Sequence, residues 1–137
     1  MTTDPLALRV LVVDDDRGIR HLLELLLERQ GWVVESLEDG SEAVERILSS
    51  RPDVVVLDLM LPHTSGFEIL ERLQAAEPAL MHHVVVVTAA SSQTLGALHC
   101  QDVIWKLIRK PFDIGELVTS VSACAAAQRP SRAEAAH

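Results

Sequence analysis

The run Val54-Val-Val-Leu57 is short, unbroken and rich in β-branched residues, and two similar runs accompany it, Val10-Leu-Val-Val13 and Val84-Val-Val-Val87. Continuous apolar runs of this length are typical of strands covered on both faces, as in a parallel sheet with helices on each side. Weaker strand patterns occur at 32–37 and 103–108. The sequence therefore predicts an α/β fold with five strands.

Helical patterns fill the gaps between these strands. Apolar residues recur at helical spacing between Ile19 and Leu27, and Gly31 follows as the expected terminator of that helix. Further helices are predicted at 41–48, at 67–73 and at 113–127, with a short one between 91 and 101. We expect Ser41 or Gly40 to cap the second helix and Asp113 the last. Strands alternating with helices imply right-handed crossovers and one parallel sheet.

Composition excludes several classes of protein. The chain has 137 residues, 48% of them apolar and 23% charged, as expected for one globular domain. It shows neither the ~18 apolar residues of a membrane helix nor a secretory signal. The cysteines, Cys100 and Cys124, lack metal-ligand spacing and favour a reduced, cytoplasmic protein. A net charge of −8 without a basic cluster argues against direct nucleic-acid binding.

Polar side chains follow the predicted strands where each one ends. The first strand runs into Asp14-Asp15-Asp16, the third into Asp58, the fourth into Thr88 and the fifth into Lys110. Ligands of open parallel sheets bind at this carboxyl edge. We therefore expect Asp14, Asp15 and Asp58 to lie close together. Because three carboxylates repel one another, either their pKa values rise or a cation compensates them.

The chemistry of this set favours phosphoryl transfer onto a carboxylate. Mg²⁺ prefers carboxylates, waters and a phosphate oxygen as ligands. Lys110 supplies a positive charge that can pair with a carboxylate or with a phosphoryl group, and the hydroxyl of Thr88 can donate to a phosphoryl oxygen. An Asp would then be the nucleophile. Asp16 is interpreted as a helix cap, and His63, His82 and His83 as surface loop residues.

The motifs resemble the receiver domain of two-component response regulators. The matching segments are Leu11-Val-Val-Asp14-Asp15-Asp16, Pro52 to Pro62, Gly66, Val87-Thr88-Ala89 and Lys110-Pro111-Phe112. The resemblance covers about residues 6–126, which leaves 1–5 and 127–137 as expected flexible tails. It implies the flavodoxin-like, doubly wound (βα)5 fold, with helices on both faces of a sheet in strand order 2-1-3-4-5.

The resemblance also implies a role for each site residue. Asp58 would be the phosphoacceptor, with a sensor histidine kinase or a phosphotransfer protein as donor. Asp15, Asp58 and the backbone carbonyl of Met60 would bind Mg²⁺ directly, and Asp14 would help through water. Thr88 would hydrogen-bond the phosphoryl group and shift on activation, and Lys110 would pair with that group. Such a protein is a regulator, not an enzyme, although it assists its own phosphoryl transfer and dephosphorylation.

The departures from the family pattern cluster near the fifth strand. Leu107 stands where receivers usually carry an aromatic residue, and Val103-Ile104 replaces a common Gly-Ala pair. Trp105 is expected near the start of that strand, on the same side as Leu107. The surface formed by the fourth helix, fifth strand and fifth helix would then bind a downstream protein or a second copy in a homodimer, with Trp105 as the anchor.

Two other functions fit parts of the pattern. Because Leu107 replaces the aromatic, the chain could be a receiver-like scaffold that signals without phosphate. Asp14-x-Asp16 after a strand also resembles the nucleophile motif of haloacid-dehalogenase-type phosphatases. Those enzymes need a cap insertion and a later acidic pair, for which this chain is too short.

Overall fold

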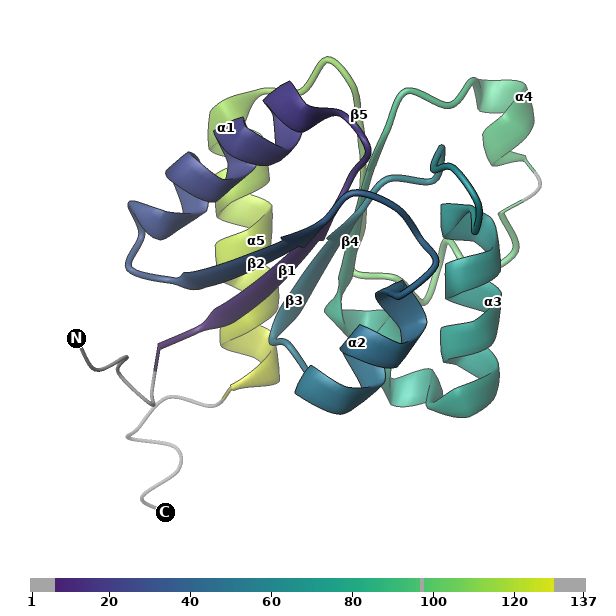
Figure 1. Cartoon of the computed structure of the whole chain (residues 1–137), viewed down its shortest axis with the longest axis horizontal. Helices are drawn as coiled ribbons and strands as arrows, with labels where there is room; N and C mark the ends of the chain where they lie inside the picture. The colour runs from purple at the N-terminus through teal and green to yellow at the C-terminus, as the bar shows by residue number, and fades with distance from the viewer. Residues whose placement is uncertain (1–6, 97, 130–137) are drawn as a thin grey trace.

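The computed structural model describes residues 7–96 and 98–129, and within them five parallel strands form one sheet in the order β2-β1-β3-β4-β5 (Figure 1). The strands are β1 (Arg9–Val13), β2 (Val33–Leu37), β3 (Val54–Leu57), β4 (Val84–Thr88) and β5 (Lys106–Arg109). The helices are α1 (Arg17–Glu28), α2 (Ala43–Ser50), α3 (Gly66–Ala76), α4 (Ser92–Leu95) and α5 (Ile114–Gln128), with a 3₁₀ helix, η1 (Pro78–His83). The predicted flavodoxin-like fold and strand order are confirmed.

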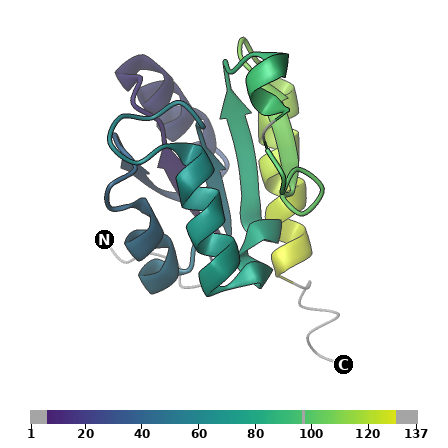
Figure 2. The same ribbon diagram turned by 90° about the vertical axis from the view of Figure 1, so that its right-hand side faces the viewer.

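Two apolar clusters cover the two faces of the sheet. Successive residues of a strand point to opposite faces. Leu11, Val55 and Val86 therefore face the cluster that includes α2, α3 and α4, whereas Val12, Val56 and Val87 face α1 and α5 (Figures 1 and 2). Both faces are buried, which explains why the strand sequences are apolar without interruption.

Several predicted helix ends agree with the structure. The carboxylate of Asp16 accepts a hydrogen bond from the N–H of Ile19 at 3.1 Å and so caps α1. Gly31 has a φ of +85° just beyond that helix, a conformation that glycine adopts without steric cost. Asp113 caps α5 by accepting from the N–H of Glu116 at 2.9 Å.

The predicted cap of α2 is wrong. The N-cap of this helix is Glu42, which makes no side-chain capping bond. The N–H and hydroxyl of Ser41 donate instead to Asp39, at 2.8 and 2.6 Å. Gly40 packs against backbone: a Cβ there would lie 1.9 Å from the carbonyl oxygen of Thr64. The turn before α2 is therefore shaped by contacts within the loop and with the β3–α3 loop.

The fifth strand also begins later than predicted. Residues 103–105 form turns and bends, and β5 starts at Lys106. The apolar side chains of Leu98, Cys100 and Ile104 are buried against the α2–α3 side of the sheet. Their apolar character resembles that of a strand or a helix. In the structure they belong to an irregular segment between the four-residue α4 and β5, and this segment covers the core.

The region before β4 is a 3₁₀ helix that the sequence pattern did not predict. His82 and His83 lie in η1 rather than in a loop. His82 is exposed, but His83 is half-buried, with its Nδ1 2.9 Å from the carbonyl oxygen of Asp53. The surface-loop interpretation is therefore wrong for His83, whereas His63 does lie in an exposed loop.

At its C-terminal end, α5 continues to Gln128, past the predicted domain border at residue 126. The predictions for residues 1–5 and 130–137 lie outside the described residues. Within the described ranges, none of the helices has the length and hydropathy that crossing a membrane requires.

Candidate functional site

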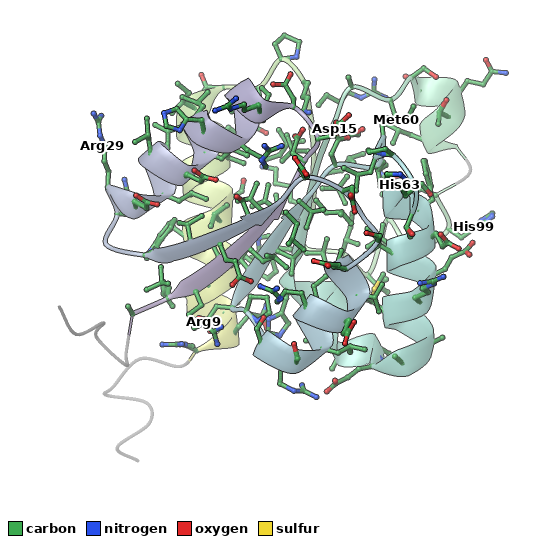
Figure 3. The ribbon with its side chains drawn as sticks, in the orientation of Figure 1. Arg9, Asp15, Arg29, Met60, His63 and His99 are labelled. Atoms are coloured by element: carbon green, nitrogen blue, oxygen red, sulfur yellow. The ribbon has the colours of Figure 1, made fainter. Side chains whose placement is uncertain are left out.

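Three carboxylates meet at the carboxyl edge of the sheet. Asp14 and Asp15 follow β1, and Asp58 follows the neighbouring β3. One carboxylate oxygen from each lies within 4.8 Å of the others. Asp14 and Asp58 are buried, with 3% and 5% of their surface exposed, whereas Asp15 is exposed. Figure 3 shows Asp15 and Met60 at this end of the molecule and Arg9 at the opposite end. The structure thus brings together the acids that the sequence singled out.

Lys110 joins two of these acids. Its Nζ lies 2.8 Å from Oδ2 of Asp14 and 2.9 Å from Oδ2 of Asp58. Burial by itself would lower the pKa of Lys110, but the hydrogen bonds to both carboxylates outweigh it, so the pKa is raised. Lys110 therefore stays protonated and acts as a fixed positive charge between the two buried acids.

The hydrogen bonds to Asp14 only partly offset the cost of burying its negative charge. Burial raises the pKa of its carboxyl group, while the hydrogen bonds from Lys110 and from the N–H of Asp16 act in the opposite direction, and the net shift is upward. The charge of Asp58 adds to the upward shift. Three carboxylates lie together and the ammonium group of Lys110 pairs with two of them, so the cluster carries an excess of negative charge. An oxygen-only donor set of this kind fits a hard divalent cation such as Mg²⁺.

The second oxygens of the buried acids bind the backbone. Oδ1 of Asp14 accepts from the N–H of Asp16 at 2.9 Å, and Oδ1 of Asp58 accepts from the N–H of Met60 at 3.0 Å. These bonds fix the orientation of both carboxylates. The backbone of Met60 therefore lies beside Asp58, while its side chain is 54% exposed.

Thr88 ends β4 next to the site and is fully buried. Its carbonyl oxygen accepts from the N–H of Lys110 at 2.9 Å, so the ends of β4 and β5 are tied together. Its Oγ1 accepts from the N–H of Ala90 at 3.2 Å. The hydroxyl proton of Thr88 is thus left to act as a donor.

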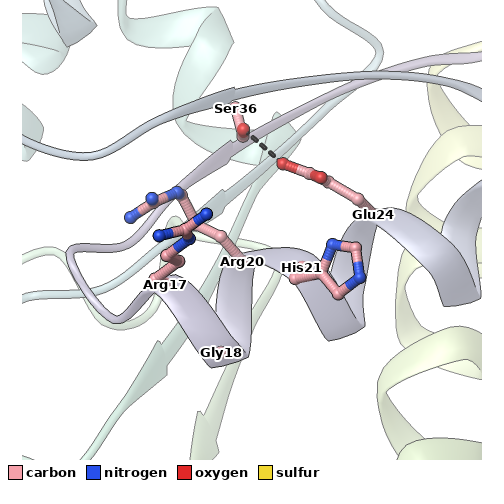
Figure 4. A pocket seen from close by; sticks show the side chains of 6 residues that line it. All are labelled: Arg17, Gly18, Arg20, His21, Glu24 and Ser36. Atoms are coloured by element: carbon pink, nitrogen blue, oxygen red, sulfur yellow. Dashed lines mark hydrogen bonds between the residues drawn. The ribbon is translucent and has the colours of Figure 1, made fainter.

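Arg20 is a site neighbour that sequence reasoning missed. Its Nη1 donates to the backbone carbonyl of Asp14 at 2.9 Å. The sequence offered one indication of this contact, because Arg20 lies one turn into the helix that Asp16 caps, close to the end of β1. Arg20 also lines a surface groove beside α1, together with Arg17, Gly18, His21, Glu24 and Ser36 (Figure 4). Ser36 donates to Glu24 across that groove, and none of the three acids lines it.

On the predicted signalling face, Leu107 is half-buried against the cluster that contains α3 and α4. Trp105 lies one residue before β5, and its N–H donates to the carbonyl oxygen of Val84 at 2.8 Å. The residue is 37% exposed. Lys106, the residue after Trp105, forms an ion pair with Glu116 of α5, with 3.5 Å between Nζ and Oε1.

The fold and the acidic edge match known proteins. A family model described as the response regulator receiver domain matches residues 10–122. The chain therefore belongs to the response regulator receiver domain family of two-component systems. The resemblance of its motifs to that family is confirmed.

Individual relatives agree with this assignment. The chain is 36% identical over 118 residues to the response regulator MprA of Mycobacterium ulcerans (strain Agy99), an alignment that covers 86% of this chain and 50% of that protein. The chain thus spans about half the length of this relative. This relative and the MprA protein of Mycolicibacterium vanbaalenii, 37% identical over 115 residues, are both named response regulators.

Two solved structures are also similar. The receiver domain of the Francisella response regulator 1452 is 27% identical with a TM-score of 0.77, covering 88% of this chain and 98% of that one. The response regulator TrrA from Thermotoga maritima, solved in complex with Mg²⁺ and beryllofluoride, is 28% identical with a TM-score of 0.74, covering 85% and 98%.

Proposed function

We propose that this receiver domain is a phosphorylation-controlled switch with Asp58 as the phosphoacceptor. The carrying observation is the placement of this buried carboxylate 2.9 Å from Lys110 and within 4.8 Å of both Asp14 and Asp15. The donor is a phosphohistidine on a sensor histidine kinase or a phosphotransfer protein. An oxygen of Asp58 attacks phosphorus, the P–N bond to histidine breaks, and an acyl phosphate forms.

The residues of the acidic edge divide the remaining work. Asp15, Asp58 and the backbone carbonyl of Met60 hold Mg²⁺ in this proposal, and Asp14 contributes through water. The bound ion supplies positive charge that offsets the excess negative charge of the site. Lys110 is already held between Asp14 and Asp58 and can turn toward a phosphoryl oxygen. Thr88 donates its hydroxyl proton to another.

The switch signals through protein contacts, with the α4–β5–α5 face as the output surface. Trp105 is a large aromatic residue that is partly exposed beside this face, and such residues often anchor interfaces. Its partner is a downstream protein or a second copy of the chain. The protein assists its own phosphorylation and dephosphorylation and turns over no separate substrate. The proposal includes a cytoplasmic location, which the two free thiols, Cys100 and Cys124, favour.

A receiver-like scaffold that signals without phosphate is the second candidate, favoured by Leu107 in place of an aromatic residue. It predicts that Asp58→Ala keeps normal partner binding. The phosphatase alternative has no support from the family assignment. It predicts that phosphorylation survives Asp58→Ala and is lost in Asp14→Ala.

The test is phosphorylation by a small donor. Incubation with acetyl phosphate and Mg²⁺ should add one phosphate that is labile to base, as acyl phosphates are. EDTA should prevent the reaction, and Asp58→Asn should abolish it. A phosphate that still appears on Asp58→Asn would show that another residue is the acceptor. Glu68→Gln, a change on the exposed surface of α3, is the matched control and should be phosphorylated like the wild type.

A further inference from the structure

Arg109, the last residue of β5, and Lys110, which follows it, contact different parts of the molecule. Lys110 binds Asp14 and Asp58 in the acidic site. Arg109 is the register partner of Thr88 in the sheet, and its Nη2 donates to Oγ of Ser92 at 2.8 Å. Ser92 is the first residue of α4. The end of β5 is therefore bonded both to the site and to the start of α4.

The segment between Thr88 and Ser92 makes few other hydrogen bonds with the rest of the fold, although Ala90 packs in the apolar core. Ala90 donates to Oγ1 of Thr88, and Ser91 caps α4 by accepting from the N–H of Thr94 at 3.1 Å. The helix has four residues, of which Leu95 is buried. Such a short helix gains little stability from its own hydrogen bonds. Ala90 and Leu95 hold it against the apolar core, and the bond from Arg109 ties its first residue to the neighbouring strand.

The two ends of the Arg109–Ser92 bond differ in how firmly they are held. The backbone of Arg109 belongs to the sheet, and the next residue, Lys110, donates to the carbonyl oxygen of Thr88. Ser92 is exposed and four residues from the Thr88 hydroxyl. If Thr88 moves toward a phosphoryl group, the chain that follows it moves as well. A displacement of Ser92 by about 1 Å is enough to break a hydrogen bond of this length.

We propose that Arg109 is a positioning residue that holds the start of α4 through Ser92 and so opposes the switch. This inference rests on the proposed function of Asp58 and Thr88. Leu107 lies on the same face of β5 and has no polar group with which to bond α4. The polar link between β5 and α4 is therefore made by Arg109, and breaking it is part of the free energy that phosphorylation must supply.

The test is the affinity for beryllofluoride, a phosphoryl mimic, in the presence of saturating Mg²⁺, measured by isothermal titration calorimetry. Arg109→Ala and Ser92→Ala should each bind about two- to fivefold more tightly than the wild type, which is the effect of one net hydrogen bond. The double variant should gain nothing further, because both changes remove the same bond. Ser92→Thr keeps the hydroxyl and should bind less tightly than Ser92→Ala.

Two controls separate coupling from general effects on the fold. The affinity for Mg²⁺ alone should be unchanged in Arg109→Ala, because Arg109 bonds α4 and not the carboxylates. Arg72→Ala removes an exposed arginine that pairs with Glu68 on α3 and should bind beryllofluoride like the wild type. Unchanged or weaker binding by Arg109→Ala would overturn the inference. If the wild type itself shows no binding that depends on Asp58, the proposed function fails first and this inference with it.

Discussion

Two buried aspartates at opposite edges of the sheet carry their charges in different ways. Asp53 precedes β3, and its two oxygens accept from the N–H of Arg9 at 2.8 Å and from Nε of Arg129 at 2.7 Å. Asp14 follows β1 and shares the ammonium group of Lys110 with Asp58. A carboxylate oxygen of Asp15 lies within 4.8 Å of oxygens of both. At the first edge one arginine side chain pairs with one acid, whereas at the second edge one lysine pairs with two acids and a third carboxylate lies beside them.

If the proposed function holds, the difference separates a structural charge, that of Asp53, from a functional one, that of Asp14. The Asp53–Arg129 pair joins the turn before β3 to the end of α5, and Gln128 adds a bond to the carbonyl oxygen of His82 at 2.9 Å. Its partners are permanent parts of the fold. At the carboxyl edge the charges of the three acids are only partly compensated, so a bound cation would stabilise that region by mass action.

The largest change in stability is expected from removing Asp53, whose charge is fully paired at the amino edge of the sheet. Asp53→Ala should lower the free energy of unfolding by about 2 kcal/mol, because the N–H of Arg9 and the partly exposed side chain of Arg129 both lose their acceptor. Urea denaturation measures the change. Glu68→Gln, which removes an exposed ion pair, should stay within about 0.5 kcal/mol of the wild type. A loss as small as in that control would mean that Asp53 does not hold this edge together.

The next effect is the response of the other edge to metal. Mg²⁺ at ten times its dissociation constant should stabilise the wild type by about 1.4 kcal/mol through mass action. Asp15→Asn should respond much less, while Asp53→Ala should keep the full response because its change lies at the far edge. Thermal melting with and without Mg²⁺ tests this. Equal responses of the wild type and Asp15→Asn would place the cation elsewhere.

Removing one of the crowded charges should stabilise the metal-free fold. Asp15→Asn is expected to raise the free energy of unfolding by about 0.5–1 kcal/mol at neutral pH and low salt, by relieving repulsion with Asp14 and Asp58. Added salt should reduce the gain.

The same gain should depend on pH. Since burial raises the pKa of Asp14 above its ordinary value of 3.8 in the folded protein, protonation of Asp14 favours folding. This contribution is complete below pH 3.8 and is lost as the pH rises through the raised pKa. Once Asp14 is protonated it no longer repels Asp15. The stability gained by Asp15→Asn should therefore shrink as the pH falls toward 4, which denaturation at several pH values measures. A gain that does not change with pH would contradict the assumed repulsion with ionised Asp14.

The smallest expected effect is optical. If α4 and its flanking segments move on activation, the emission of Trp105 should shift when beryllofluoride and Mg²⁺ are added, with Trp32→Phe isolating the signal. The shift should vanish in Thr88→Ala. A protein that binds beryllofluoride without any change in emission would show that activation does not reach Trp105.

The sequence by itself determined the fold and which polar residues end the strands at the carboxyl edge of the sheet. Unbroken apolar strands need cover on both faces, and parallel strands bring their carboxyl ends to one edge. The positions of Asp14, Asp58, Thr88 and Lys110 along the chain were therefore enough to predict that they meet. The caps Asp16 and Asp113 were also readable, because a cap bonds only to residues within the next turn.

Only the tertiary structure decided which charges pair and where irregular segments run. Lys110 meets Asp14 across 96 residues, and Arg129 meets Asp53 across 76. No local pattern encodes such contacts, because they depend on where whole elements come to lie. The same is true of β5, which starts at Lys106 because the residues before it fold over the core. The bond of Arg109 to Ser92 likewise exists only because β5 and the start of α4 lie side by side.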